Sequence, residues 1–238
     1  MSNAGEQIVE VIKEKELQKI STDVIETVLD TTLKEGVFKE LPILSTLFGT
    51  YNAATSIQDR LFIKKVLTFL YELKSVPQDE RIKQVIKIED DHKYKTRVGE
   101  KILFIINKCD DIDKSAMVGI LFKVYLESKI NYDEFLACVS CLERAPLPEL
   151  INFIEGDWDE LDTDGGGSEL LSYGLMEIRL TKPELKINHN SPYDFQDKYA
   201  PSEEEVLESK IELKGFKALC YVTYVGDLLR KYLRNNQS

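Results

Sequence analysis

The stretch LPILSTLFGTYNAATSIQDRLFIKKVLTFLYEL, residues 41–73, is the longest hydrophobic segment of the chain. No charged residue occurs in its first part, residues 41–58. Pro42 suits the first turn of a helix, and Ser56 followed three positions later by Asp59 is a capping-box pattern. Apolar residues then recur at helical spacing up to Leu73, with charged residues between them. We therefore expect two core helices here, or one helix with a joint near Ser56.

The rest of the N-terminal part repeats this pattern of apolar stripes separated by short polar joints. One predicted helix starts near Pro77 and turns Ile82, Val85 and Ile86 inward. Asn131 with Glu134 forms a second capping box. Helices that follow one another with short joints are typical of an antiparallel helical array. We therefore expect an all-α domain over residues 5–145.

The pattern changes at APLP, residues 145–148. Residues 175–180 alternate apolar and polar side chains, which predicts a strand, and residues 218–222 form a second predicted strand. A last helix is expected after Thr223. The predicted fold is mainly α, with an N-terminal multi-helix array and a small α+β domain over residues 146–238.

Two sets of motifs resemble known groups of proteins. The segments LLSYGLMEI (residues 170–178) and YVTYVGDLLRKYL (residues 221–233) resemble the wing-entry and final-helix segments of winged-helix domains. The segments LPILSTLFG and SIQDRLFIKK, within residues 41–65, resemble a group of uncharacterised bacterial and mobile-element proteins. The second resemblance implies a related fold and a role in phage or mobile-element conflict, and it supplies no catalytic residue.

The charge of the chain is distributed unevenly. The net charge is −11, of which residues 1–145 contribute −3, from 21 basic and 24 acidic groups, and residues 146–238 contribute −8, from 10 and 18. Between residues 60 and 101 the balance reverses, with 11 basic against 7 acidic groups. An anionic or protein partner is therefore expected to bind there, if anywhere. The candidate contact residues are Arg60, Lys64, Lys65, Lys93, Tyr94, Lys95 and Arg97.

The start of the chain and the cysteines bear on its location. Residues 1–4 read as an expression-vector remnant, and a charged helix rather than a signal peptide is predicted after them. The four cysteines follow no regular framework, which favours reduced thiols over disulfides. We therefore expect a cytoplasmic protein.

The sequence lacks the usual signatures of enzymes. It contains no nucleophile elbow, phosphate-binding loop, HExxH helix or dinucleotide fingerprint. The two histidines, His92 and His189, sit among charged and polar residues that favour a solvated position over a catalytic one. Cys138 and Cys141 have C-x-x-C spacing, but they lie on an apolar stripe two turns inside a predicted helix. We expect no enzyme activity, no cofactor and no metal centre.

The segment over residues 155–169 is acidic and rich in glycine. Residues 155–167 hold six acids and four glycines, which predicts a flexible, hydrated loop. Glu160, Asp162, Asp164 and Gly165 match the first half of an EF-hand loop, but Leu171 stands where the bidentate acid is required. A weak calcium site remains the alternative to a solvated linker.

These features together favour a non-enzymatic interaction or regulatory protein that acts through a protein partner or as a homo-oligomer. A winged-helix DNA-binding regulator is one alternative, although the helix predicted over residues 168–173 has no Lys or Arg. A membrane-active, abortive-infection-type effector that inserts residues 41–58 is the other. Ser45, Asn52 and other polar residues within that segment oppose insertion.

Overall fold

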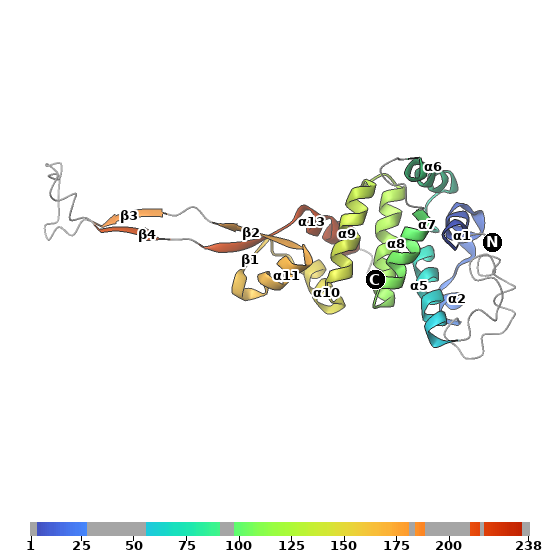
Figure 1. Ribbon diagram of the computed structural model, residues 1–238, viewed down its shortest axis with the longest axis horizontal. Helices are drawn as coiled ribbons and strands as arrows, with labels where there is room; N and C mark the ends of the chain where they lie inside the picture. The colour runs from blue at the N-terminus through green and yellow to red at the C-terminus, as the bar shows by residue number, and fades with distance from the viewer. Residues whose placement is uncertain are drawn as a thin grey trace. The chain divides into compact units, whose positions relative to one another are not determined.

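The computed structural model describes residues 4–27, 56–90, 98–180, 184–188, 210–214 and 217–234. By its internal contacts the chain divides into two units (Figure 1). The helical unit comprises Met1–Asp157 and Tyr224–Ser238, and the inserted unit comprises Trp158–Thr223. The described residues are mainly helical and include a three-stranded antiparallel sheet, as the sequence predicts at this coarse level.

The helical unit is an array of helices with short connections. Its elements are α1 (Ala4–Lys13), the 3-10 helix η1 (Lys15–Lys19), α2 (Thr22–Thr27), α5 (Ile57–Leu73), α6 (Gln78–Glu89), α7 (Val98–Lys108), α8 (Ile112–Leu126), α9 (Tyr132–Arg144), α10 (Leu147–Glu155) and α13 (Tyr224–Leu233). Both predicted capping boxes are confirmed: Asp59 N–H donates to Ser56 Oγ at 3.1 Å, and Glu134 N–H donates to Asn131 Oδ1 at 2.9 Å. These hydrogen bonds satisfy amides that the helix itself leaves unpaired.

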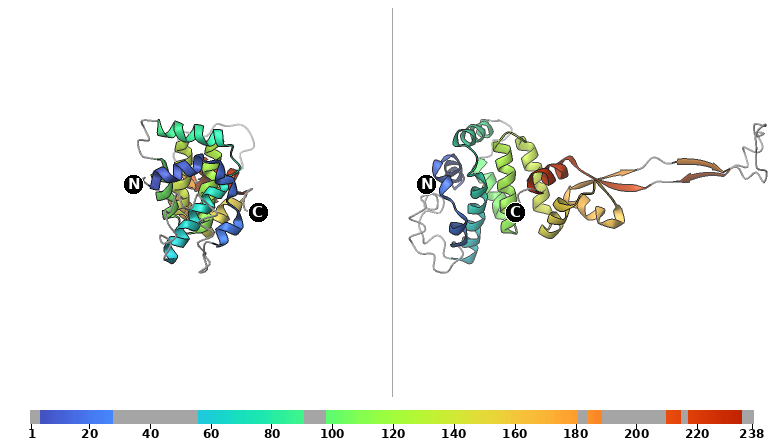
Figure 2. Two further views of the ribbon diagram at one scale, coloured as in Figure 1. Left: turned by 90° about the vertical axis from the view of Figure 1, so that its right-hand side faces the viewer. Right: turned by 180° about the vertical axis from the view of Figure 1, so that it is seen from behind.

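Helix α8 forms the centre of this unit. Its buried residues occur on all sides of the helix and include Leu121 and Phe122, which are both fully buried. A helix that is apolar all round must be surrounded by other elements. α8 lies between α5 and α9, in the first view and from behind (Figures 1 and 2). Phe122 joins the three helices, because its ring lies 5.7 Å from that of Phe69 in α5 and 5.3 Å from that of Phe135 in α9.

Two pairs of helices approach closely at glycines. A Cβ on Gly119 of α8 would lie only 2.8 Å from the carbonyl oxygen of Phe69 in α5. A Cβ on Gly99 of α7 would lie 1.8 Å from the carbonyl oxygen of Gly5 in α1. Backbones in such direct contact have no room for a side chain, so these positions fix how the helices cross.

The predicted inward face of α6 is partly wrong. Val85 is buried as expected, but Ile86 is 44% exposed, and Arg81 and Gln84 are buried instead. The guanidinium of Arg81 donates to the carbonyl oxygen of Ile12 at 2.7 Å, to that of Glu14 at 2.6 Å and to that of Val76. Arg81 therefore joins α6 to the end of α1, and these three acceptors compensate for burying its charge.

The inserted unit contains the strands. Its elements are β1 (Glu160–Asp162), the 3-10 helix η4 (Thr163–Gly165), α11 (Gly167–Tyr173), β2 (Met176–Leu180), β3 (Glu184–Asn188), β4 (Lys210–Lys214) and β5 (Ala218–Val222). The strand order β1-β5-β2 places β5 between two antiparallel neighbours. Both predicted strands are confirmed, as β2 and β5. Gly174 ends α11 in the left-handed conformation, with φ 79°, as expected of a glycine in this position.

Strands β3 and β4 pair in the same register as β2 and β5. Leu180 pairs with Ala218, and the next described pair is Glu184 with Lys214. The two pairs are four positions apart on both sides, so the pairings of the two sheets have the same alignment.

The boundaries of the units differ from the predicted division between residues 145 and 146. Helices α10 and α13 pack with each other, and α13 also packs with α8 and α9. Arg230 of α13 donates to the carbonyl oxygen of Phe153 at 3.0 Å, and Arg234 donates to that of Ile154 at 2.7 Å. These bonds cap the C-terminal end of α10, which explains why both helices group with the helical unit.

Within the described ranges, no helix is both long and apolar enough to cross a bilayer. The proposed membrane segment, residues 41–58, lies outside those ranges except for residues 56–58.

The crossing of α5 and α8 yields a first test. We expect Gly119→Ala to lower the free energy of unfolding by about 1–3 kcal/mol, because the added methyl group meets the backbone of Phe69, and this exceeds the gain in helix propensity. The measurement is urea denaturation of the full chain. Gly165→Ala is the control, since nothing lies within 4 Å of its new methyl group. Equal midpoints for the two variants would exclude a tight crossing at Gly119.

Candidate functional site

The seven predicted contact residues are only partly described. Arg60, Lys64 and Lys65 lie on α5, and all three are half-buried. Lys65 Nζ donates to the carbonyl oxygen of Cys109, just after α7, so this charge caps a helix of the same unit. Lys93, Tyr94, Lys95 and Arg97 lie outside the described residues, as do His92 and His189. An anion-binding face over residues 60–101 stays a prediction.

The acidic segment is not simply a loop. Residues 160–162 form β1, in which Glu160 pairs with Tyr221 and Asp162 with Leu219, and Thr163–Gly165 is a 3-10 turn. The expectation of an irregular loop was therefore wrong for residues 160–165, because β5 supplies a partner strand distant in sequence. In the part of the chain that the structure describes, no three His, Cys, Asp or Glu residues are grouped to hold a metal ion.

The cysteines are buried and form no disulfide bond. All four, Cys109, Cys138, Cys141 and Cys220, are thiols with 5% exposure or less. Burial raises the pKa of Cys138 to about 12 and raises the pKa of Cys141 as well. A redox or metal-binding C-x-x-C motif needs an accessible thiolate, so the prediction that these two cysteines are buried small residues is confirmed.

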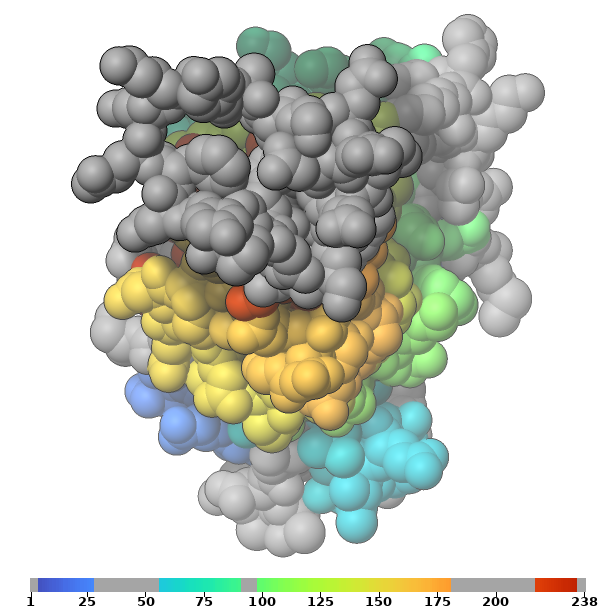
Figure 3. Space-filling view, turned by 90° about the vertical axis from the view of Figure 1, so that its left-hand side faces the viewer, coloured from blue at the N-terminus to red at the C-terminus, as the bar shows by residue number. Residues whose placement is uncertain are grey.

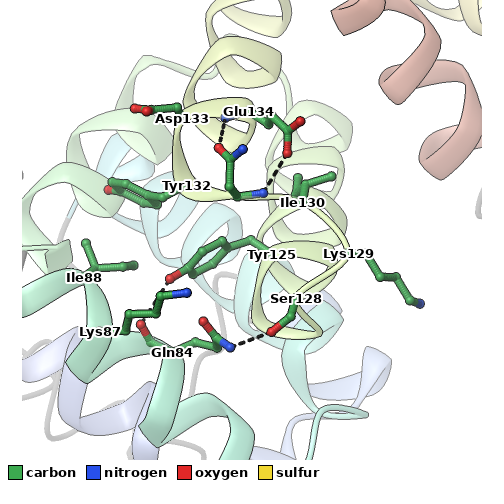
Figure 4. A pocket seen from close by; sticks show the side chains of 11 residues that line it. Gln84, Lys87, Ile88, Tyr125, Ser128, Lys129, Ile130, Tyr132, Asp133 and Glu134 are labelled. Atoms are coloured by element: carbon green, nitrogen blue, oxygen red, sulfur yellow. Dashed lines mark hydrogen bonds between the residues drawn. The ribbon is translucent and has the colours of Figure 1, made fainter.

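A pocket of about 460 Å³ lies in the helical unit between α6 and the turn that joins α8 to α9 (Figure 4). Its walls include Gln84 and Lys87 of α6, Tyr125 of α8 and the first turn of α9. Ser128, in the turn, has a positive φ of 59° and its hydroxyl accepts from Gln84 Nε2 at 2.6 Å. The volume is that of a small-ligand site.

The polar groups around this pocket serve the fold. Tyr125 donates its hydroxyl to the carbonyl oxygen of Gln84 at 3.1 Å. Glu134 accepts from Asn131 N–H through Oε2 and from the Tyr224 hydroxyl through Oε1, and this second bond raises the pKa of Tyr224. Lys129 is paired with Glu127 at 2.6 Å. These groups stabilise the helix ends and attach α13 to α9, and none of the pairs couples a nucleophile to a base.

Strand β2 has a different environment. Among the strands that the structure describes, it lies at the edge of the sheet with β5 as its neighbour, and its burial falls after Met176. Ile178 is 53% exposed and Leu180 is 68% exposed, both large apolar side chains. The orange atoms of residues 170–180 lie at the surface in the space-filling view (Figure 3). An open strand edge that carries apolar side chains is a place where another strand can pair.

Sequence patterns alone did not reveal this edge. Residues 175–180 were predicted as a strand, but the strand order that leaves one side of β2 open depends on pairing with β5. The available signal is the alternation MEIRL, in which apolar residues enclose one acid and one base.

Comparison of the chain with protein-family models, with curated proteins and with solved structures gave no match. The functional assignment therefore depends on the geometry of the pocket and of the β2 edge.

The buried thiols give a second test. We expect the native protein at pH 8 to react with a thiol reagent about tenfold or more slowly than the chain unfolded in guanidinium, since buried thiols stay protonated and shielded. Absorbance of the released reporter measures the rate. Rapid labelling of Cys138 or Cys141 in the folded state would contradict the structural role and restore a reactive C-x-x-C motif.

Proposed function

We propose that this chain is a non-catalytic protein-binding protein in which the helical unit is the scaffold and the inserted unit binds the partner. The observation that carries this proposal is the open edge of β2, with Ile178 and Leu180 exposed. Natural sheets usually protect their edges with charges, bulges or covering segments. Besides the charges of Glu177 and Arg179, β2 carries two exposed apolar side chains, and such a strand is suited to strand addition, in which a partner extends the sheet.

The scaffold role is supported by contacts within the helical unit at the residues that flank the insertion. Before the insertion, the side chain of Asp157 binds Arg234 Nη1 at 2.8 Å. After the insertion, the Tyr224 hydroxyl donates to Glu134 at 2.6 Å. Residues next to each boundary are thus fixed within the packed helical unit.

A winged-helix relationship of the C-terminal part belongs to the same proposal. The chain order β1, α11, β2, β5, with a helix before and after, and the three-stranded sheet both support it. The grouping of α10 and α13 with the helical unit opposes it. DNA binding is disfavoured as its purpose, because α11, the helix that would enter the groove, contains Glu169 and no Lys or Arg.

The cellular setting is also proposed rather than observed. Four buried cysteines without a disulfide bond support a reducing compartment such as the cytoplasm. The resemblance within residues 41–65 supports a role in phage or mobile-element conflict, where a binding protein could act by sequestering its partner.

A site-specific cross-linking experiment tests the proposed function. A benzophenone amino acid is placed at Ile178 or Leu180 of the full chain, and at Ile57 and Ile86 as controls, in cells that produce the protein. Ile57 is 73% exposed and Ile86 is 44% exposed, so adducts that follow exposure alone should be most abundant at Ile57. We expect illumination to give discrete adducts with protein mainly at positions 178 and 180. Similar yields at all four positions would overturn the proposal.

A further inference from the structure

The hydrogen-bond pattern of β5 determines which backbone groups of β2 are unpaired within the sheet. Thr223 N–H donates to the carbonyl oxygen of Leu175 at 3.0 Å, on the β2 side, and Val222 N–H donates to that of Asp159 at 3.1 Å, on the β1 side. In an antiparallel ladder these directions alternate along each strand. The backbone N–H and C=O groups therefore point toward β5 at residues 175, 177 and 179. They point to the open edge at Met176, Ile178 and Leu180.

We propose that this edge pairs with the β2 edge of a second copy of the chain, antiparallel, about a two-fold axis at Ile178. The inference rests on the proposed function and names its partner. In this arrangement the two Ile178 residues exchange N–H···O=C bonds, and Met176 of each copy pairs with Leu180 of the other. The two three-stranded sheets become one sheet of six strands.

The alternation of backbone groups restricts the possible registers. A residue whose backbone N–H and C=O groups point to the open edge must pair with a residue of the same kind in the other copy. Such residues alternate along β2, so a two-fold axis must pass through a residue and cannot pass between two residues. An axis at residue 177 would place Glu177 opposite Glu177, and an axis at residue 179 would place Arg179 opposite Arg179. Only the axis at Ile178 places Glu177 of each copy opposite Arg179 of the other.

The same register is favoured by the side chains. Glu177 and Arg179 are 50% and 61% exposed, and Arg179 Nε lies 2.9 Å from Glu177 Oε1 within one copy. Pairing about Ile178 would surround each charge with two opposite charges, at non-hydrogen-bonded positions where facing side chains are closest. A register shifted to include β3 would put Leu180 opposite Glu184 and Ile178 opposite Lys186. In that register Glu177 would no longer lie opposite Arg179.

The predicted interface is small. Five residues of each copy take part, which is well below a standard interface, so we expect a dimer that forms at about 10–100 µM protein and not at nanomolar concentrations.

Charge reversal tests the proposal, because contacts within one copy cannot restore association when two variants are mixed. Glu177→Arg puts Arg opposite Arg179 twice, and Arg179→Glu puts Glu opposite Glu177 twice. Each variant alone should self-associate about tenfold or more weakly than the unchanged chain, because both facing pairs become repulsive. An equimolar mixture of the two variants should form a 1:1 heterodimer, because every facing pair in it is again opposite in charge.

Sedimentation velocity of the full-length proteins measures the association constants, and native mass spectrometry identifies the heterodimer. Both substituted residues are exposed, and circular dichroism confirms that the variants are folded. Three results would overturn the inference: an unchanged chain that stays monomeric up to about 100 µM, variants that dimerise as well as the unchanged chain, or a mixture that does not recover association. A monomeric chain that still gives cross-links at positions 178 and 180 would leave the proposed function standing with a different protein as partner.

Discussion

The close crossing of α5 and α8 at Gly119 is the contact on which the helical unit depends. Because α8 is buried on every side, the unit is stable only if α5, α9 and their neighbours enclose it. The backbone contact at Gly119 brings α5 near enough for Phe69 and Phe122 to pack. This packing buries most apolar side chains of the described helices, whereas Ile57, Ile86 and Phe104 stay exposed.

The inserted unit contrasts with this arrangement. Among its described residues, β2 has β5 as a neighbour on one side, and the seven-residue helix α11 packs near it. Met176 and Cys220 are buried, whereas Ile178 and Leu180 remain exposed. The apolar side chains of β2 lie at a strand edge, where a partner strand can also pair with the backbone, and this is the physical basis for assigning binding to the second unit.

Local signals in the sequence predicted much of the fold. The capping boxes at Ser56 and Asn131 and the alternation of residues 175–180 need only a few neighbouring residues, and each is confirmed. Non-local features were missed. Strand β1 has three residues, two of them acidic, and exists because β5 pairs with it. Arg81 is buried because carbonyls of α1 and of the residues after it are placed nearby by packing, which its own helix does not reveal.

The candidate site was predicted less well for the same reason. The basic residues of α5 were identified by charge, yet Lys65 donates a hydrogen bond to the carbonyl oxygen of Cys109 at the end of α7. The other four predicted contact residues lie outside the described residues. The β2 edge depends on which neighbour β5 takes on each side, and this is a property of the whole sheet. Once the strand order is known, the sequence MEIRL restricts how two copies of β2 can pair. Only a two-fold axis at Ile178 places Glu177 of one copy opposite Arg179 of the other.

Hydrogen exchange of the β2 amides at two protein concentrations tests the central claim most directly. At about 1 µM the amides of Ile178 and Leu180 should exchange rapidly, because they face an open edge, while those of α8 should be protected. At about 200 µM we expect the β2 amides to exchange several times more slowly and the α8 amides to be unchanged, since mass action fills the edge with a second copy. Exchange at Ile178 that is slow at low concentration, or identical at both, would contradict an open strand edge that binds another chain.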